Sequence, residues 1–423
     1  MSLAFLDISD SNLQLWCDEH HLRSPGYALL AGKDYTFGRQ ARASARLEPR
    51  NINTRYWWQL STEALQPALG PARHTGDLVH AHLQQLYREA GKPTEMLLAV
   101  SGSMQRDQLA LLLGIVQQCP FDAVGLVHRS VALGSLYGGP GKLFHLEVQL
   151  HQALVTELAE NGGQLALQRS VPLPGCGLLQ LQERLVEVIA GGFIRQTRFD
   201  PRRKAATEQQ LYDALPDTLR TLRREGETNL EINGYRARVT RDELLGAGQR
   251  LFDGAAQNIG ALENGDRVLV DPLAALMPGL AEQFPQLEEL DRHAMQQALE
   301  QHADRLVQRG QALSFITTLP CLRQAITPRS LEPDPEPAVE QAPPPPTATH
   351  LLRGSQAEPL LATGTPLAGG WELLAEGGGW QLRGQGGNAR VNGAAYDGHQ
   401  LLGAGDRITL DGHPEALLID VLG

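Results

Sequence analysis

Histidines supply the two groups of residues whose types could bind a metal ion. His80 and His82 are separated by two positions in an amphipathic stretch, which places them on different faces of a helix, and His74 lies further away. The run 18–21, Asp-Glu-His-His, matches a metal site in composition only. We therefore predict histidines on different faces of one helix and a solvated hairpin end, with a metal site as the alternative for each.

Common motifs for nucleophilic catalysis and for phosphate binding are missing. Ser101 and Ser103 flank Gly102, but no G-x-S-x-G pattern occurs. The run 139–142, Gly-Pro-Gly-Lys, lacks both the spacing and the hydroxyl residue of a P-loop. The basic run 202–204 follows a proline and predicts a solvated approach to a helix, the alternative being a contact for an acidic partner.

Composition places the chain among globular proteins. It has 423 residues, 42% of them hydrophobic and 20% charged, with a formal net charge of −11. That charge repels phosphate backbones, so we expect protein partners rather than nucleic acid. No run approaches the roughly 18–20 apolar residues of a membrane span, and Asp7 interrupts any signal-peptide core, so we expect no membrane contact and a cytoplasmic location. The four cysteines lack C-x-x-C spacing, so free thiols are expected.

A proline-rich stretch divides the chain. Residues 330–349 contain seven prolines and four acidic residues and cannot form a core, so they predict a flexible spacer, with an SH3-type docking segment at 343–346 as the alternative. Residues 350–423 alternate short apolar runs with turn signals, among them Asn392-Gly393 and Asp411-Gly412. They predict a small all-β sandwich or barrel.

Residues 1–329 mix strand and helix patterns. Compact apolar runs predict strands at 3–8, 13–16, 95–100, 123–127, 143–150 and 153–158. Apolar residues at helical spacing predict helices at 77–90, 107–118, 180–194, 211–224 and 242–258. We therefore predict an α/β domain over 1–329.

The order of these elements resembles the actin-like ATPase superfamily, nearest the nucleotide-binding domain of DnaK-type heat-shock chaperones. Five segments carry the resemblance: 6–12 (family D-L-G-T-T-N), 96–108 (I-T-V-P-A-Y-F-x-x-x-Q-R), 127–138 (N-E-P-T-A-A-A-L-A-Y-G), 232–252 (I-T-R-x-x-F-E) and 267–280 (V-x-L-V-G-G-S-S-R-I-P). The resemblance implies a two-lobed fold. If nucleotide binds, it also implies that Asp7, Asn12 and Glu147 contact it and that Asp7 holds magnesium through water.

The residues that would contact nucleotide depart from this pattern. In the first phosphate loop, Ser9 replaces a glycine and Asp10 puts a carboxylate where phosphate would lie. The second loop, 147–152, has none of the family's three glycines, and Arg129 stands at the catalytic glutamate. Asp271-Pro272 replaces the paired glycines near adenosine. We therefore predict a pseudo-ATPase with no catalytic residue and no cofactor, the alternative being unusual Mg-ATP binding.

Residues 380–410 resemble the second half of forkhead-associated (FHA) domains. Val391-Asn392-Gly393 and Gly405-Asp406-Arg407-Ile408 match the family's V-N-G and G-D-x-I. The residues that contact phosphothreonine in that family have no counterpart, so we expect a general protein-interaction module. The whole chain predicts a non-catalytic scaffold or adaptor, with an active ATP-binding chaperone-like or actin-like protein as the alternative.

Overall fold

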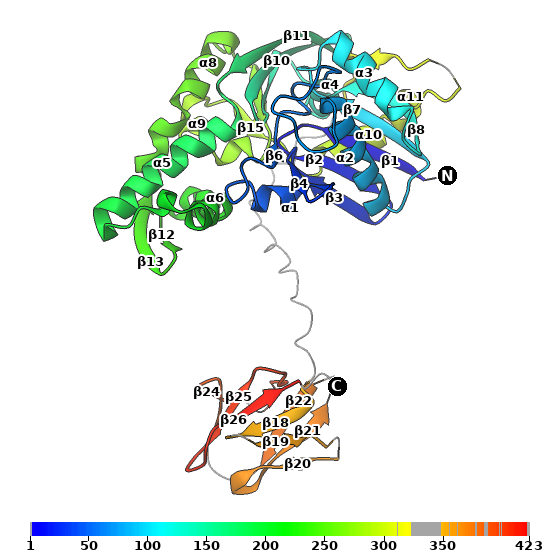
Figure 1. Cartoon of the computed structure of the whole chain (residues 1–423). Coiled ribbons are helices and arrows are strands. Elements are labelled where there is room, and N and C mark those ends of the chain that lie inside the picture. Colours follow the sequence, from blue (N-terminus) through cyan, green and yellow to red (C-terminus); the bar gives the residue numbers. More distant parts are fainter. Residues whose placement is uncertain are drawn as a thin grey trace. The chain divides into compact units, whose positions relative to one another are not determined.

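A computed structural model describes residues 2–310, 312–322, 348–354, 356–361, 363–376, 379–384, 388–396, 398 and 400–420 (Figure 1). The chain divides into two compact units, 1–325 and 326–423, and each is considered by itself. The predicted spacer 330–349 lies outside the described residues except for Ala348 and Thr349. These two belong to the second unit, because Ala348 is buried in its core and the Thr349 N–H donates to the Ile419 carbonyl.

The first unit is mixed α/β and contains two six-stranded sheets. The first sheet has the order β16-β8-β7-β1-β2-β3. Its strands are β1 (Leu3–Ile8), β2 (Leu13–Cys17), β3 (His20–Ser24), β7 (Glu95–Val100), β8 (Asp122–His128) and β16 (Phe315–Ile316). Strands β1, β2 and β3 form an antiparallel meander, while β7 and β8 continue parallel to β1 on its other side.

Five strands of the second sheet repeat this topology, and the sixth, β17, pairs with β11 at the other edge. The order of this sheet is β15-β14-β9-β10-β11-β17, with an antiparallel meander β9-β10-β11 and with β14 and β15 parallel to β9. Its strands are β9 (Lys142–Val148), β10 (Gln152–Asn161), β11 (Gln164–Pro174), β14 (Arg267–Val270), β15 (Leu287–Glu289) and β17 (Thr318–Pro320). Strand β1 of the first sheet and strand β9 of the second therefore hold equivalent central positions.

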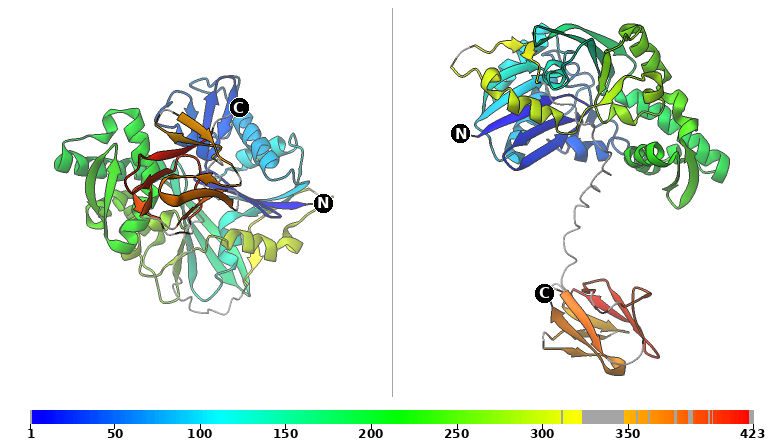
Figure 2. Two further views of the ribbon diagram at one scale, coloured as in Figure 1. Left: turned by 90° about the horizontal axis from the view of Figure 1, so that it is seen from below. Right: turned by 180° about the vertical axis from the view of Figure 1, so that it is seen from behind.

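Helices cover the faces of both sheets (Figure 2), and the buried side chains form three apolar clusters. Helices α2 (Thr75–Glu89) and α3 (Arg106–Val116) pack on the first sheet. Helices α5 (Leu178–Thr197), α6 (Ala205–Glu225) and α8 (Gln249–Ile259) pack on the second. Helices α4 (Arg129–Ser135) and α10 (Ala294–Gln301) share one cluster with strands of both sheets. This shared core joins the two halves of the unit through burial of leucine, valine and methionine side chains.

Shorter elements connect these layers. The strands β4 (Ala28–Ala31), β5 (Asp34–Phe37) and β6 (Ile52–Asn53) form a small sheet beside helix α1 (Gly38–Ala43), and β12 (Glu227–Ile232) pairs with β13 (Tyr235–Thr240). The remaining helical turns are η1 (Pro201–Arg203), η3 (Ala274–Leu276), α9 (Leu280–Gln283) and α11 (Ala303–Leu306). Within the described parts of the chain, no helix has the length and apolar character needed to cross a membrane.

The predicted strands and four of the five predicted helices are confirmed, with ends shifted by a few residues. The fifth helix, 242–258, is wrong as a single element, because it divides into α7 (Arg241–Leu244), the 3₁₀ turn η2 (Leu245–Gly248) and α8. Gly246 and Gly248 weaken the helix at this point. A Cβ at Gly248 would also lie 2.4 Å from the Phe252 ring, so the turn brings the backbone close to that side chain.

The described residues of the second unit form strands and one short 3₁₀ turn, η4 (Ala368–Gly370). One sheet has the order β19-β18-β26-β25-β23-β24, and the other has the order β20-β21-β22. The strands are β18 (His350–Arg353), β19 (Gln356–Pro359), β20 (Thr365–Pro366), β21 (Trp371–Glu376), β22 (Gly379–Gly384), β23 (Ala389–Val391), β24 (Ala394–Ala395), β25 (Arg407–Leu410) and β26 (Ala416–Ile419). Asn392 and Gly393 both have positive φ between β23 and β24, which confirms the predicted hairpin turn.

Candidate functional site

Three carboxylates surround one arginine where the two sheets of the first unit meet. Asp7 lies near the end of β1, Glu147 near the end of β9, and Asp271 directly after β14. Arg129 is the first residue of α4. Side chains alternate along a strand, and Asp7 and Glu147 lie on the faces that also carry Leu3 and Leu143 toward the shared core. The duplicated topology therefore brings both acids to one place.

Arg129 makes two bidentate ion pairs. Its Nε lies 2.7 Å from Asp7 Oδ1 and its Nη2 lies 3.2 Å from Asp7 Oδ2. Its Nη1 and Nη2 lie 3.1 and 2.8 Å from the two carboxylate oxygens of Asp271. Glu147 is the third partner, with Oε2 3.6 Å from Nη1. Such paired contacts fix the guanidinium plane and are stronger than single hydrogen bonds between neutral groups.

The cluster is almost closed to water. Asp7 and Glu147 are buried, the Arg129 side chain is 5% exposed, and that of Asp271 is 20% exposed. Burial raises the pKa of Asp7 to about 6, although Arg129 opposes the shift. Burial also acts to raise the pKa of Asp271, but Arg129 and His145 outweigh it and hold that pKa well below its usual range. Asp7 and Asp271 are therefore ionised at neutral pH and neutralise the guanidinium.

Neutral donors complete the hydrogen bonding of Glu147. Ser9 Oγ donates to Oε1 at 2.9 Å, and Ser101 Oγ donates to Oε2 at 3.1 Å. The Gln149 amide donates to Oε1 at 3.1 Å and to Ser101 Oγ at 2.7 Å. A buried carboxylate with a longer ion pair needs such donors, because unsatisfied lone pairs are costly away from water. Ser101 therefore acts here as a hydrogen-bond donor to Glu147.

The two segments expected to be phosphate loops bind each other. Asp10, in the turn between β1 and β2, accepts a 2.7 Å hydrogen bond from the Leu150 N–H in the turn between β9 and β10. Asp10 is also buried, and burial, with a smaller contribution from Glu147, raises its pKa to about 7. A cavity of about 20 Å³ beside Asp10 and Gln149 has room for about one water. The backbone amide of Leu150 is thus already paired with a carboxylate.

Two of the three predicted nucleotide-contacting residues meet in this cluster, and one lies apart. Asp7 and Glu147 both pair with Arg129. Asn12 lies in the β1–β2 turn, where its N–H donates to the Ser9 carbonyl, and its side chain makes no hydrogen bond within the described residues. The pairing of Arg129 with Asp271 was not predicted. The sequence contains a signal for this pairing. Arg129 stands where the resemblance to actin-like ATPases would place the catalytic glutamate, and Asp271 stands where it would place a glycine.

The side chains around Asp7 do not suit a magnesium ion. Both Asp7 carboxylate oxygens face the Arg129 guanidinium, whose positive charge lies where a cation or its water would be held. Across the described ranges, no three histidine, cysteine or acidic side chains are grouped to hold a metal ion. His80 and His82 lie on different faces of α2, as their spacing predicts, and of the two only His82 is buried. His82 is buried among Ser24, Tyr56 and Trp57, and burial lowers its pKa to about 3.

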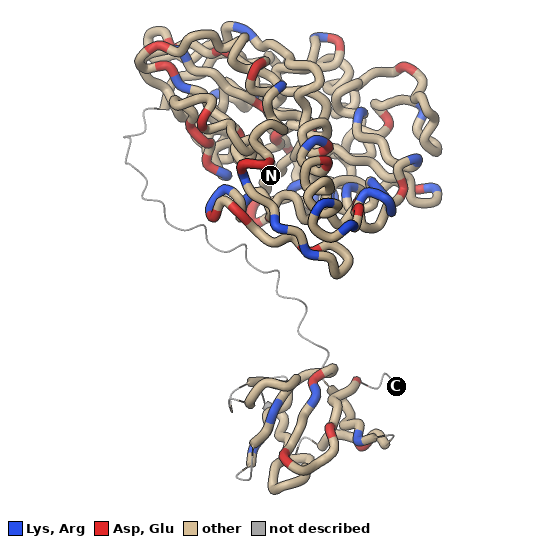
Figure 3. The backbone as a smooth tube through the Cα atoms, turned by 90° about the vertical axis from the view of Figure 1, so that its left-hand side faces the viewer, with Lys and Arg blue, Asp and Glu red and all other residues tan. Residues whose placement is uncertain are grey.

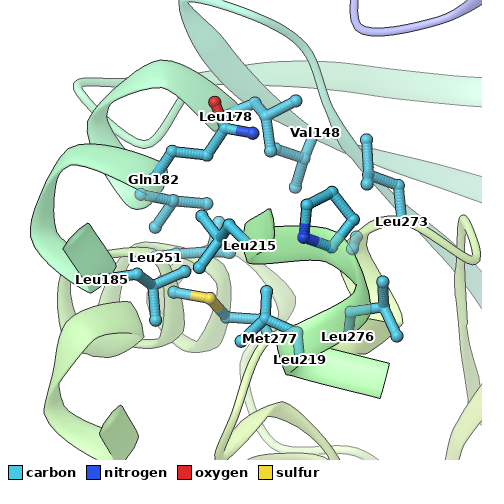
Figure 4. Close-up of a pocket in the computed structure, with 13 residues that line it drawn as sticks. Val148, Leu178, Gln182, Leu185, Leu215, Leu219, Leu251, Leu273, Leu276 and Met277 are labelled. Atoms are coloured by element: carbon cyan, nitrogen blue, oxygen red, sulfur yellow. The ribbon is translucent and has the colours of Figure 1, made fainter. Parts of the chain in front are cut away.

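An apolar pocket lies between the helices on the second sheet and the segment after β14, in the region where the resemblance implies adenosine (Figure 4). Its volume is about 40 Å³, whereas a cavity that accommodates benzene measures about 150 Å³. The polar lining residue Gln182 lies among side chains from α5, α6, α8 and the segment after β14, chiefly Leu178, Leu181, Leu185, Leu215, Leu219, Leu251, Leu273, Leu276 and Met277. A purine base does not fit this space without displacing leucines.

Replacing Arg129 by methionine should destabilise the first unit strongly. The change removes the guanidinium that three buried or partly buried acids share, so we expect the free energy of unfolding to fall by about 3–5 kcal/mol at pH 8. The loss should be smaller at pH 5, where Asp7 can take up a proton. Urea unfolding of Arg129→Met at both pH values measures this loss of stability. The exposed Arg88→Met is the control, and equal stability of the two variants at pH 8 would contradict the interpretation.

Replacing Asp10 by asparagine should stabilise the protein at alkaline pH. The pKa of this carboxyl is about 7 in the folded chain and ordinarily 3.8. Below pH 3.8 the carboxyl is neutral and does not lower the free energy of unfolding; as the pH rises through about 7 its ionisation in the buried position lowers that free energy. Asparagine keeps the acceptor for Leu150 and carries no charge. We expect Asp10→Asn to raise the free energy of unfolding by up to roughly 4 kcal/mol at pH 8 and to change it little at pH 4. Thermal or urea unfolding across this range measures the gain, with the exposed Asp34→Asn as control; a pH-independent difference would refute it.

Comparison with known proteins adds no assignment. No family model matches the sequence. No curated protein matches it either. The geometry of the Arg129 cluster therefore carries the functional argument that follows.

Proposed function

We propose that the first unit is a pseudo-ATPase of actin-like, two-lobed fold, and that the chain is a non-catalytic scaffold for protein partners. The observation that carries this proposal is the Arg129 guanidinium held between Asp7, Glu147 and Asp271. Arginine cannot accept a proton near neutral pH, and it stands at the position where the related chaperones have their catalytic glutamate.

The sheet topology supports the actin-like part of the proposal. Five strands of each sheet share one pattern, a central strand with a meander on one side and two parallel strands on the other. The sixth strand differs, because β16 extends the parallel side of the first sheet and β17 extends the meander of the second. The chain passes through the five shared strands in the same order twice, as the resemblance to the actin-like superfamily implies. Each sheet with its packed helices would be one lobe, and α4 and α10 would join the lobes through the shared core.

Three features oppose nucleotide binding at the expected place. The guanidinium of Arg129 already saturates the acid that would orient magnesium. The Asp10–Leu150 hydrogen bond ties the two loops together, and the negative Asp10 would repel phosphate at alkaline pH. The apolar pocket beside the segment after β14 is too small for a base. Each feature would have to change before Mg-ATP could bind.

A second contact holds the two halves of the unit together. Arg46, beyond α1, lies with its guanidinium carbon 3.9 Å from the centre of the Tyr212 ring on α6. Its backbone N–H donates to Gln209, and its side chain pairs with Glu208 at 3.7 Å. Opening the halves would break these contacts together with the buried ion pairs of Arg129, which are costly to leave unmatched. We therefore propose a platform of fixed shape rather than a nucleotide-driven machine.

The second unit would supply a further binding surface of FHA-like type. Asn392 Nδ2 donates to Asp406 Oδ1 at 2.8 Å, and the Arg407 N–H donates to Asn392 Oδ1 at 3.0 Å. These bonds join the V-N-G and G-D-x-I segments that carry the resemblance. Because both units belong to one chain, a partner held by one unit would be concentrated near the other.

Isothermal titration should show no Mg-ATP binding to the full chain at millimolar nucleotide. The expected absence of heat follows from the guanidinium and the loop–loop bond, which occupy the phosphate position. Arg129→Ala should not restore binding, because the loops still lack glycines. Micromolar affinity with ATP turnover that is lost on Asp7→Ala would contradict the proposal and favour the active alternative.

Partner capture should depend on the second unit. We expect the full chain to retain partners that a chain ending at residue 329 does not, when both are used as bait and bound proteins are identified by mass spectrometry. Circular dichroism of the shortened chain checks that its first unit remains folded. Identical partner sets from the two baits would remove the adaptor role of the second unit.

A further inference from the structure

Four arginines from distant parts of the sequence form what we call the arginine surface. They are Arg23 on β3, Arg39 on α1, Arg220 on α6, and Arg292 in the turn between β15 and α10. All four residues are exposed. Basic and acidic positions are distributed over the whole first unit (Figure 3), so a group of arginines is a local feature of that surface.

Packing contacts bring these segments together. A Cβ on Gly38 would lie 2.3 Å from Ser24 Oγ, so the start of α1 lies against the end of β3 and places Arg39 near Arg23. The rings of His21 and His293 lie 6.4 Å apart, which joins β3 to the turn that carries Arg292. The last turns of α6 are held near β15 by the Arg223–Glu289 ion pair at 2.7 Å.

The positive charge of this surface is only partly neutralised. Arg220 pairs with Asp217, whereas Arg23 and Arg39 make no ion pair with any residue that the structure describes. Partial burial of its guanidinium lowers the pKa of Arg23 most, and the like charges of Arg39, Arg292 and Arg220 lower it further. Such a cluster in a chain of net charge −11 favours a ligand that brings negative charge.

The backbone beside these arginines is open on one side. Strand β3 ends the order of the first sheet, so its outer edge has no strand partner among the described residues. An edge strand can accept an extended peptide as a further strand through main-chain hydrogen bonds. Charged side chains along the edge then select the sequence that binds. A polyanion without peptide groups could pair with the arginines, but it could not form main-chain hydrogen bonds with the edge of β3.

We propose that the arginine surface and the edge of β3 bind an extended acidic segment of a partner protein. The segment adds to β3 as a strand, and its carboxylates pair with Arg23 and Arg39 at one end and approach Arg220 and Arg292 at the other. Guanidinium forks match carboxylates geometrically. This inference rests on the proposed scaffold function. It depends neither on nucleotide nor on the second unit, so an experiment can refute this inference or the proposed function separately.

Fluorescence anisotropy with the full chain tests this directly. The probe is a short labelled peptide of alternating glutamate and threonine. We expect saturable binding at low salt that weakens with ionic strength, and a loss of about tenfold in affinity for Arg23→Glu/Arg39→Glu. The matched control is Arg88→Glu/Arg106→Glu on α2 and α3, which reverses two exposed arginines outside the arginine surface and should bind normally. Unchanged thermal unfolding shows that the variants are folded.

Two further probes separate the alternatives. An alternating glutamate–proline peptide has the same charge but lacks most N–H donors, so it should bind about tenfold more weakly. Equal affinity would overturn strand addition, and tighter binding of a single-stranded oligothymidylate with the same arginine dependence would overturn the choice of a peptide. If the double variant keeps its peptide affinity and only self-associates, as sedimentation would show, the arginines merely protect the edge and the proposal is wrong.

Discussion

One buried guanidinium constrains the structure around it. Burying Arg129 is favourable only because Asp7 and Asp271 each offer two oxygens to it, and those acids in turn could not be buried without a cation. Glu147, at a longer distance, needs its serine and glutamine donors for the same reason. The residues therefore depend on one another, and changing any one of them leaves a charge or a polar atom unmatched in a nearly dry environment.

The duplicated sheets explain why such distant residues can meet. Strands β1 and β9 occupy equivalent central positions, and both turn an acid toward the helices that the sheets share. An arrangement with two strand ends facing each other would suit a ligand with many negative oxygens if the loops were glycine-rich. Here the loops carry Ser9, Asp10 and Gln149. Ser9 and Asp10 bind the opposite segment, whereas Gln149 binds Glu147 of its own segment and Ser101. The same geometry therefore yields an internal contact.

Local sequence patterns predict most helices and strands, but they do not predict which residues at the ends of these elements form ion pairs. The apolar runs at 3–8 and 95–100 are strands because their side chains are buried on both faces, and composition alone indicates this. The helix predicted at 242–258 divides because two glycines and the Phe252 ring favour a tighter turn, a tertiary effect. Arg129 and Asp271 lie far apart in sequence, so only the topology reveals their pairing. The duplication itself is invisible because the two sheets share order rather than residues.

The Arg129 ion pairs also bear on the arginine surface. Arg23 and Arg39 belong to elements packed around the first sheet, whereas Arg220 and Arg292 belong to elements packed around the second. A ligand that contacts all four arginines requires the two halves of the first unit to keep one relative orientation. Arg129 provides it, since its bonds to Asp7 and Asp271 cross from one half to the other. A surface that does not reorganise loses less entropy on binding, so the Arg129 ion pairs would favour binding at the arginine surface.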